Sequence, residues 1–161
     1  MTVADVARVV GGTVEGDAGV QLAGAEVDSR RLDDGDLYVA LPGARRDGHE
    51  FVGVALETAG AALVRRDVEL ASPPPERALV RVDDPLAAYH ELARHELREH
   101  QWRVAAVTGS VGKTTTKDFL AALLAAHYRI GASGGNRNNT LGLPAEVLSQ
   151  EPDIEVFVAE A

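Results

Sequence analysis

The first half of the chain alternates short apolar runs with turns rich in glycine, aspartate and proline. Residues 3–10 repeat valine and alanine at the spacing of one helical face, and Gly11-Gly12 follows where such a helix would end. The other apolar runs predict one more helix and several short strands. The predicted helix is residues 51–59, and the predicted strands are residues 20–27, 36–41, 61–64 and 78–82. We therefore expect a small mixed α/β unit in this half.

Ser72-Pro73-Pro74-Pro75 is the clearest interruption of this pattern. Three consecutive prolines favour a stiff, extended connection and forbid a helix there. Further on, Asp83-Asp84-Pro85 has the acidic cap and the first-turn proline of a helix start, which predicts a helix over residues 85–100. We place a domain boundary near residue 82. The two predicted domains are residues 1–82 and 83–161.

The second half alternates predicted strands and helices. The strands are residues 103–108, 128–132 and 154–159, and the helices are residues 114–127 and 143–149. This alternation is typical of βαβ units and predicts a parallel sheet. The chain stops where a further layer of a nucleotide-binding fold would begin, which indicates a truncated domain. The predicted fold class is therefore α/β throughout.

Composition and charge exclude several classes of function. A formal net charge of −9 argues against non-specific nucleic-acid binding, because that binding depends on Lys and Arg neutralising phosphates. The absence of cysteine excludes disulfides, zinc thiolate sites and iron–sulfur clusters in this sequence. No apolar run approaches the roughly 20 residues of a membrane span, and the start of the sequence does not resemble a secretory signal. We expect a cytoplasmic protein without membrane insertion.

A glycine-rich loop connects the predicted strand at 103–108 to the helix that follows it. Glycine lets the backbone turn tightly and approach phosphate oxygens, and the helix start directs free N–H groups at an anion. Lys113 would reach the β and γ phosphates, where it is the candidate catalytic residue, and the Thr114 hydroxyl would join a Mg²⁺ shell. The residues expected to bind the nucleoside triphosphate are Gly109, Ser110, Val111, Gly112, Lys113, Thr114 and Thr115.

The loop departs from the strict phosphate-binding motif at one position. That motif needs a glycine five residues before Gly112, where this chain has Val107. An ordinary glycine-rich turn is the alternative interpretation. Lys113 and the three threonines after it have no packing purpose at a helix start, which favours the phosphate-binding interpretation.

Four further stretches accompany this loop. They are Asp28-Ser29-Arg30, Gly35-Asp36-Leu37-Tyr38-Val39-Ala40-Leu41-Pro42-Gly43, Asp47-Gly48-His49-Glu50-Phe51 and Gly135-Asn136-Arg137-Asn138-Asn139-Thr140-Leu141-Gly142-Leu143-Pro144. The loop resembles the ATP loop of the Mur ligases, which add amino acids to the peptidoglycan precursor. The first three stretches are similar to the UDP-sugar domain of that family. The fourth, together with Ser110 and Lys117, is similar to the dipeptide-adding members in particular.

The resemblance implies an ATP-dependent, amide-forming ligase that joins D-alanyl-D-alanine to UDP-N-acetylmuramoyl-tripeptide through an acyl phosphate. It implies ATP and Mg²⁺ as cofactors, these two small-molecule substrates as partners, and a monomer. The implied fold is a small N-terminal UDP-substrate domain followed by the first half of a P-loop central domain. Two alternatives stay open: the related ligase that forms the UDP-linked tripeptide, and a non-catalytic nucleotide or UDP-sugar binding module.

The resemblance also implies roles for residues that the pattern alone would leave as turns or exposed charges. Glu160 matches the family's second magnesium carboxylate, and Ser29 and Arg30 would contact the UDP portion. Residues that could hold the substrate near the γ-phosphate are Asn136, Asn138 and Asn139. The family's carbamylated lysine, its downstream histidine ligand, the adenine pocket and the amine-binding domain have no counterpart here. We therefore expect the chain alone not to complete the reaction.

Overall fold

The computed structural model describes residues 1–43, 46–134 and 139–160. The chain divides into two compact units, Met1–Leu92 and Ala93–Ala161, which are described separately. The division falls within the helix α3 (Pro85–Glu99), about ten residues after the boundary that the sequence indicates near residue 82. That boundary stays a prediction. No helix in the described part of the chain is both long enough and apolar enough to cross a membrane.

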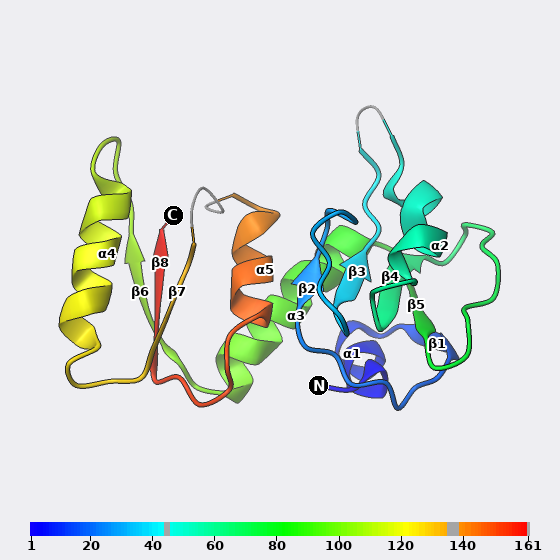
Figure 1. Ribbon diagram of the computed structural model, residues 1–161, viewed down its shortest axis with the longest axis horizontal. Coiled ribbons are helices and arrows are strands. Elements are labelled where there is room, and N and C mark those ends of the chain that lie inside the picture. Colours follow the sequence, from blue (N-terminus) through cyan, green and yellow to red (C-terminus); the bar gives the residue numbers. More distant parts are fainter. Residues whose placement is uncertain (44–45, 135–138, 161) are drawn as a thin grey trace. The chain divides into compact units, whose positions relative to one another are not determined.

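The first unit contains a five-stranded sheet whose strand order is β1-β5-β4-β3-β2. Strand β1 runs antiparallel to β5, and the other neighbouring strands are parallel. Figure 1 shows the elements of this unit in blue to green. The strands are β1 (Thr13–Gly16), β2 (Ala25–Glu26), β3 (Leu37–Val39), β4 (Ala61–Arg65) and β5 (Ala78–Val82). The helices, besides the start of α3, are α1 (Val3–Val10), the 3-10 helix η1 (Gly48–Phe51) and α2 (Val52–Ala55).

Helix α1 forms where the sequence predicts it because both ends are capped. Thr2 and Asp5 make a reciprocal capping box, in which the Thr2 hydroxyl accepts the Asp5 N–H and the Asp5 carboxylate accepts the Thr2 N–H. Gly11 ends the helix with a φ of 64°, which glycine adopts without steric cost. Val3 and Val6 are fully buried on its inner face. The predicted helix is confirmed.

The core of the first unit lies around the two central strands, β4 and β5. Leu63, Val64, Leu79 and Val80 are fully buried, because both faces of these strands are covered. Continuous apolar runs are typical of such strands, and both predicted strands are confirmed. Tyr38 of β3 joins the same core, and its hydroxyl donates to the Gly48 carbonyl.

Three elements of the first unit differ from the sequence-based expectation. The predicted strand at 20–27 contributes only β2, because the Leu22 and Ala23 N–H groups donate outside the ladder, to the Met1 and Gly35 carbonyls. The predicted helix at 51–59 is shorter, since η1 and α2 end before a series of turns. Strand β1 was not predicted.

The second unit contains a three-stranded parallel sheet of order β6-β8-β7, so the predicted parallel sheet is confirmed. Phe157 and Ala159 of the central strand pack with Trp102 and Val147 in its core. Helix α4 contacts all three strands. The elements are β6 (Arg103–Val107), α4 (Lys113–Leu124), β7 (Ile130–Ala132), α5 (Gly142–Leu148) and β8 (Val156–Glu160).

Candidate functional site

The predicted phosphate-binding loop lies between β6 and α4, and its two glycines have unusual backbone angles. Gly109 has a φ of 151° and Gly112 a φ of 77°. A Cβ atom at either position would meet no atom within 4 Å, so the backbone angle, and not a lack of space, favours glycine there. Gly112 directly precedes α4, and within the described residues no side chain caps this helix start. The first-turn N–H groups are therefore suited to an anion.

Thr114 and Glu160 meet beside this loop although they are 46 positions apart in the sequence. The Thr114 hydroxyl donates to Glu160 Oε2 at 2.8 Å. Thr114 lies in the first turn of α4, and Glu160 is the last residue of β8. Glu160 is only 6% exposed, which is rare for a carboxylate. A hydroxyl and a carboxylate in contact are oxygen ligands of the type that Mg²⁺ prefers.

Two buried residues next to this pair were not assigned a role from the sequence. Lys117 Nζ donates to the Ser133 carbonyl at 2.5 Å, and Ser133 Oγ accepts the Glu160 N–H at 2.9 Å. Lys117 and Ser133 are 5% and 3% exposed. One indication was present in the sequence. Lys117 follows Lys113 by four residues, which places both on the same face of the helix.

The predicted UDP contacts lie beside a cavity of about 620 Å³ in the first unit. Arg30 makes a two-pronged ion pair with Asp28, in which Nε lies 2.8 Å from Oδ1 and a terminal nitrogen lies 2.7 Å from Oδ2. These hydrogen bonds from Arg30 lower the pKa of the Asp28 carboxyl to about 2. The residues that line the cavity are Val27, Asp28, Ser29, Arg30, Leu41, Arg46, Gly48, Phe51 and Val54.

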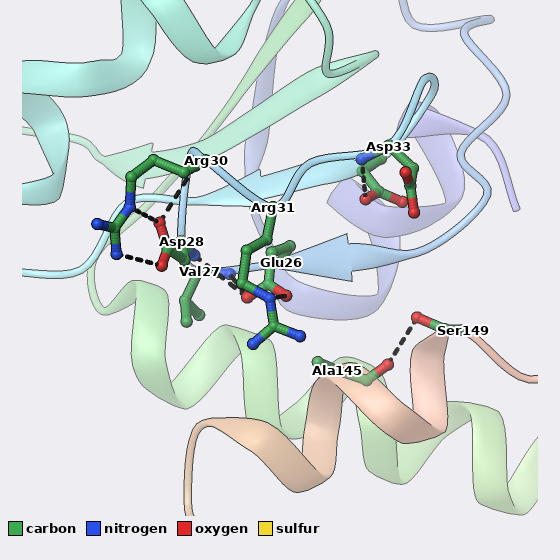
Figure 2. Close-up of polar contacts among 9 residues, drawn as sticks. Glu26, Val27, Asp28, Arg30, Arg31, Asp33, Ala145 and Ser149 are labelled. Carbon is green, nitrogen blue, oxygen red and sulfur yellow. Dashed lines mark hydrogen bonds and ion pairs between the residues drawn. The ribbon is translucent and has the colours of Figure 1, made fainter. Parts of the chain in front are cut away.

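A buried carboxylate supports the loop that carries Ser29 and Arg30. Glu26 is 6% exposed, and its Oε1 accepts the backbone N–H groups of Val27 and Asp28 at 2.8 Å and 3.2 Å. Figure 2 shows Glu26 beside Val27 and the Asp28 carboxylate facing the guanidinium of Arg30. The sequence analysis did not single out Glu26. A charged residue within a short strand gives no sign that its carboxylate will turn back onto the following backbone.

His49 is a structural residue of the first unit. Its Nε2 accepts the Arg65 N–H at 2.9 Å, and its Nδ1 lies 2.6 Å from Asp47 Oδ1. Because Nε2 accepts, the ring proton is on Nδ1 and is donated to Asp47. Hydrogen bonds from the His49 backbone and ring lower the pKa of Asp47. These contacts connect the Asp-Gly-His stretch to strand β4.

Of the three asparagines predicted to hold substrate, only Asn139 can be placed. Its Oδ1 accepts the N–H groups of Leu141 and Gly142 at 3.0 Å and 2.7 Å, so it stabilises the turn that leads into α5. Asn136 and Asn138 lie outside the described residues.

A family model matches the C-terminal third of the chain, and relatives match nearly all of it. The Mur ligase middle domain family matches residues 107–161, which contain the loop, α4 and β8. UDP-N-acetylmuramoyl-tripeptide--D-alanyl-D-alanine ligase of Bacillus subtilis is 43% identical over 161 residues, which are 99% of this chain and 35% of that protein. The chain belongs to the Mur ligase family. The ligase of the same name from Escherichia coli is 35% identical over 99% of the chain and 34% of its own length.

Solved Mur ligases have the same fold as this chain. A crystal structure of MurF from Acinetobacter baumannii superposes with a TM-score of 0.84 at 30% identity, over 99% of this chain and 35% of its own. MurF from Thermotoga maritima, solved in complex with ADP, gives a TM-score of 0.70 at 32% identity, over 88% of this chain and 32% of its own. This Mur ligase chain thus spans about a third of the length of the relatives that it matches.

Proposed function

We propose that this chain supplies the UDP-substrate and ATP-binding parts of a ligase that joins D-alanyl-D-alanine to UDP-N-acetylmuramoyl-tripeptide. The observation that carries the proposal is the contact between Thr114 and Glu160 beside a loop with an uncapped helix start. The two substrates are inferred from the names of the relatives from Bacillus subtilis and Escherichia coli. The reaction passes through an acyl phosphate on the substrate's terminal carboxylate. The 161 residues bind ATP and the UDP-linked substrate.

The loop fits the phosphates of ATP. The angles of Gly109 and Gly112 bring the backbone close to an anion, and residues 109–115 then offer N–H groups to its oxygens. Lys113, the first residue of α4, supplies a positive charge for the β and γ phosphates. The Thermotoga maritima relative was solved in complex with ADP, which supports a nucleotide as a ligand of this chain. When bound, ATP supplies the phosphoryl group that activates a carboxylate.

Thr114 and Glu160 fit a Mg²⁺ ion. Their oxygens lie 2.8 Å apart, at a separation that neighbouring ligands of one small cation can adopt. The buried Glu160 carboxylate supplies negative charge, and the hydroxyl adds a neutral oxygen. When bound, Mg²⁺ neutralises charge on the transferring phosphoryl group.

The cavity beside Ser29 and Arg30 fits the UDP portion of the substrate. Its volume of about 620 Å³ lies within the ordinary range for a small-molecule site. Arg46 lies over the Phe51 ring at 5.7 Å, so the cavity wall combines a cation with an aromatic face. The Asp28 ion pair holds the Arg30 guanidinium, which can bind a pyrophosphate oxygen through its remaining N–H groups. Asn136, Asn138 and Asn139 are proposed to contact the substrate near the γ-phosphate.

A non-catalytic nucleotide or UDP-sugar binding module is the second candidate for these 161 residues. The ligase that forms the UDP-linked tripeptide is less favoured. A diaminopimelate-adding ligase superposes with a TM-score of only 0.55 at 18% identity. We further propose a cytoplasmic monomer.

Equilibrium binding and phosphate release test the proposal together. We expect the chain to bind ATP with Mg²⁺, and to bind UDP-N-acetylmuramoyl-tripeptide in a manner that Arg30→Ala weakens. Arg8→Ala is the matched control, since Arg8 is an exposed arginine of α1 paired with Asp5. Phosphate release that requires both substrates would favour the ligase, because a binding module holds its ligand and releases no phosphate. Failure to bind ATP or UDP-N-acetylmuramoyl-tripeptide would contradict the proposal. ATP hydrolysis at a rate independent of the UDP-linked substrate would also contradict it.

A further inference from the structure

Three hydrogen bonds form a closed ring among α4, β7 and β8. Thr114 Oγ1 of α4 donates to Glu160 Oε2 of β8, and the Glu160 N–H donates to Ser133 Oγ, directly after β7. The Ser133 carbonyl accepts a hydrogen bond from Lys117 Nζ. Because Lys117 belongs to α4, this bond closes the ring. Each bond connects a different pair of elements. The ring therefore fixes the distance from the start of α4 to the carboxyl ends of two strands.

Three of the four residues in this ring are buried. Lys117, Ser133 and Glu160 are 5%, 3% and 6% exposed, so three polar side chains are removed from water together. Burying an ammonium costs free energy unless hydrogen bonds and charge compensate for the lost hydration. Lys117 has the Ser133 carbonyl at 2.5 Å and Asp118 Oδ1 at 2.9 Å, but the Asp118 side chain is 65% exposed.

The lysines of the chain are concentrated at this site. The sequence contains only two lysines, and both belong to α4. Lys113 lies at the start of the helix beside the loop, whereas Lys117 is buried one turn further on. An apolar residue at position 117 would pack in the same place without a desolvation penalty. The charged side chain of Lys117 is therefore best explained by its hydrogen bond to the Ser133 carbonyl.

We propose that Lys117 and Ser133 are positioning residues that hold the Glu160 carboxylate against the Thr114 hydroxyl, and so set the affinity of this site for Mg²⁺. The inference rests on the proposed function and extends it to residues outside the loop and outside the proposed Mg²⁺ ligands. Lys117 fixes the Ser133 backbone, and Ser133 Oγ fixes the Glu160 backbone. That backbone position limits where the Glu160 carboxylate can lie, and the Thr114 hydroxyl holds one of its oxygens. Groups that orient metal ligands typically change metal affinity by about 10- to 100-fold when removed.

The test is a Mg²⁺ titration of the 161-residue chain with a saturating non-hydrolysable ATP analogue. Ser133→Ala and Lys117→Met are expected to raise the apparent Kd for Mg²⁺ by about tenfold or more, while the Kd of the analogue measured in EDTA changes less than about twofold. Ser133→Thr keeps a hydroxyl and is expected to restore most of the Mg²⁺ affinity. Ser149→Ala is the matched control, because Ser149 Oγ donates to the Ala145 carbonyl within α5 and takes no part in the ring.

A merely structural role gives a different result. Substitutions with such a role would weaken binding of the analogue equally with and without Mg²⁺, or leave the affinities for the analogue and for Mg²⁺ unchanged. Either outcome would overturn the proposal. If the unsubstituted chain binds no nucleotide, the proposed function fails, and hydrogen exchange then tests the ring. Lys117→Met should speed exchange of the Glu160 amide relative to Ser149→Ala, although position 117 does not contact that amide. Unchanged exchange would refute the coupling.

Discussion

Replacing Gly112 by alanine isolates the backbone contribution of the phosphate-binding loop. Gly112 has a φ of 77°, and a Cβ atom there would meet no atom within 4 Å. Since no clash is created, the cost comes from placing an L-residue in the left-handed region, about 1–2 kcal/mol. In a unit of this size, 1 kcal/mol lowers Tm by roughly 4–8 °C. We therefore expect Gly112→Ala to lower the unfolding temperature of the second unit by several degrees.

Trp102 provides the assay for this prediction. It is the single tryptophan of the chain, it is 6% exposed, and it lies in the core of the second unit. Its fluorescence during urea or thermal unfolding therefore reports on the unit that contains the loop. Gly112→Asn is expected to recover part of the loss, because asparagine tolerates the left-handed region better than alanine does.

Gly134→Ala is the matched control in the same unit. Gly134 has no left-handed φ, and a Cβ atom there would make ordinary contacts with the Glu146 carboxylate at 3.6 Å and 3.8 Å. We expect this variant to be neutral or slightly stabilising, because alanine reduces the freedom of the unfolded chain. Equal stability of Gly112→Ala and Gly134→Ala would refute the reasoning that the loop needs glycine for its backbone angle.

Three further predictions concern the first unit and can be measured by calorimetry. Leu63→Ala, in a fully buried position, should cost about 2–5 kcal/mol, whereas Val54→Ala, at 64% exposure, should cost little. Thr2→Ala removes the capping box of α1 and should cost about 1 kcal/mol, and a wild-type Tm would contradict the capping argument. The folded pKa of Asp28, about 2, lies below its unfolded value, so its pairing with Arg30 stabilises the unit at higher pH and is lost as pH falls from about 4 to about 2. Asp28→Asn should flatten the fall in Tm over that range, and an unchanged slope would contradict the assignment.

The sequence predicts elements well where local signals and burial agree. Residues 78–82 form β5 as predicted, because an apolar run between polar turns suits a strand buried on both faces. Residues 3–10 form α1 because caps at both ends reinforce the helical spacing. Strand β1 escaped prediction because its stability depends on pairing with β5, where Val14 lies opposite Val80 in a distant part of the chain.

The candidate site shows the same division. A local pattern is enough to locate residues 109–115, since the glycines, the lysine and the helix start are adjacent in sequence. The family resemblance was needed to select Glu160, and the structure places it against Thr114. Lys117 and Ser133 could not be joined from the sequence, because their contact depends on how α4 packs on the sheet. The role of Glu26 could likewise not be predicted from the sequence, because its hydrogen bonds depend on the direction of its side chain.

The most direct test of the central claim is a calorimetric titration of ATP into the chain with and without Mg²⁺, repeated for Lys113→Met. We predict saturable binding at one site, stronger with Mg²⁺, and its loss when the Lys113 charge is removed from the loop. Arg103→Met, which removes an exposed charge from β6, is expected to leave binding unchanged. Absence of saturable binding, or equal binding by Lys113→Met, would contradict the assignment of residues 109–115 to a nucleotide.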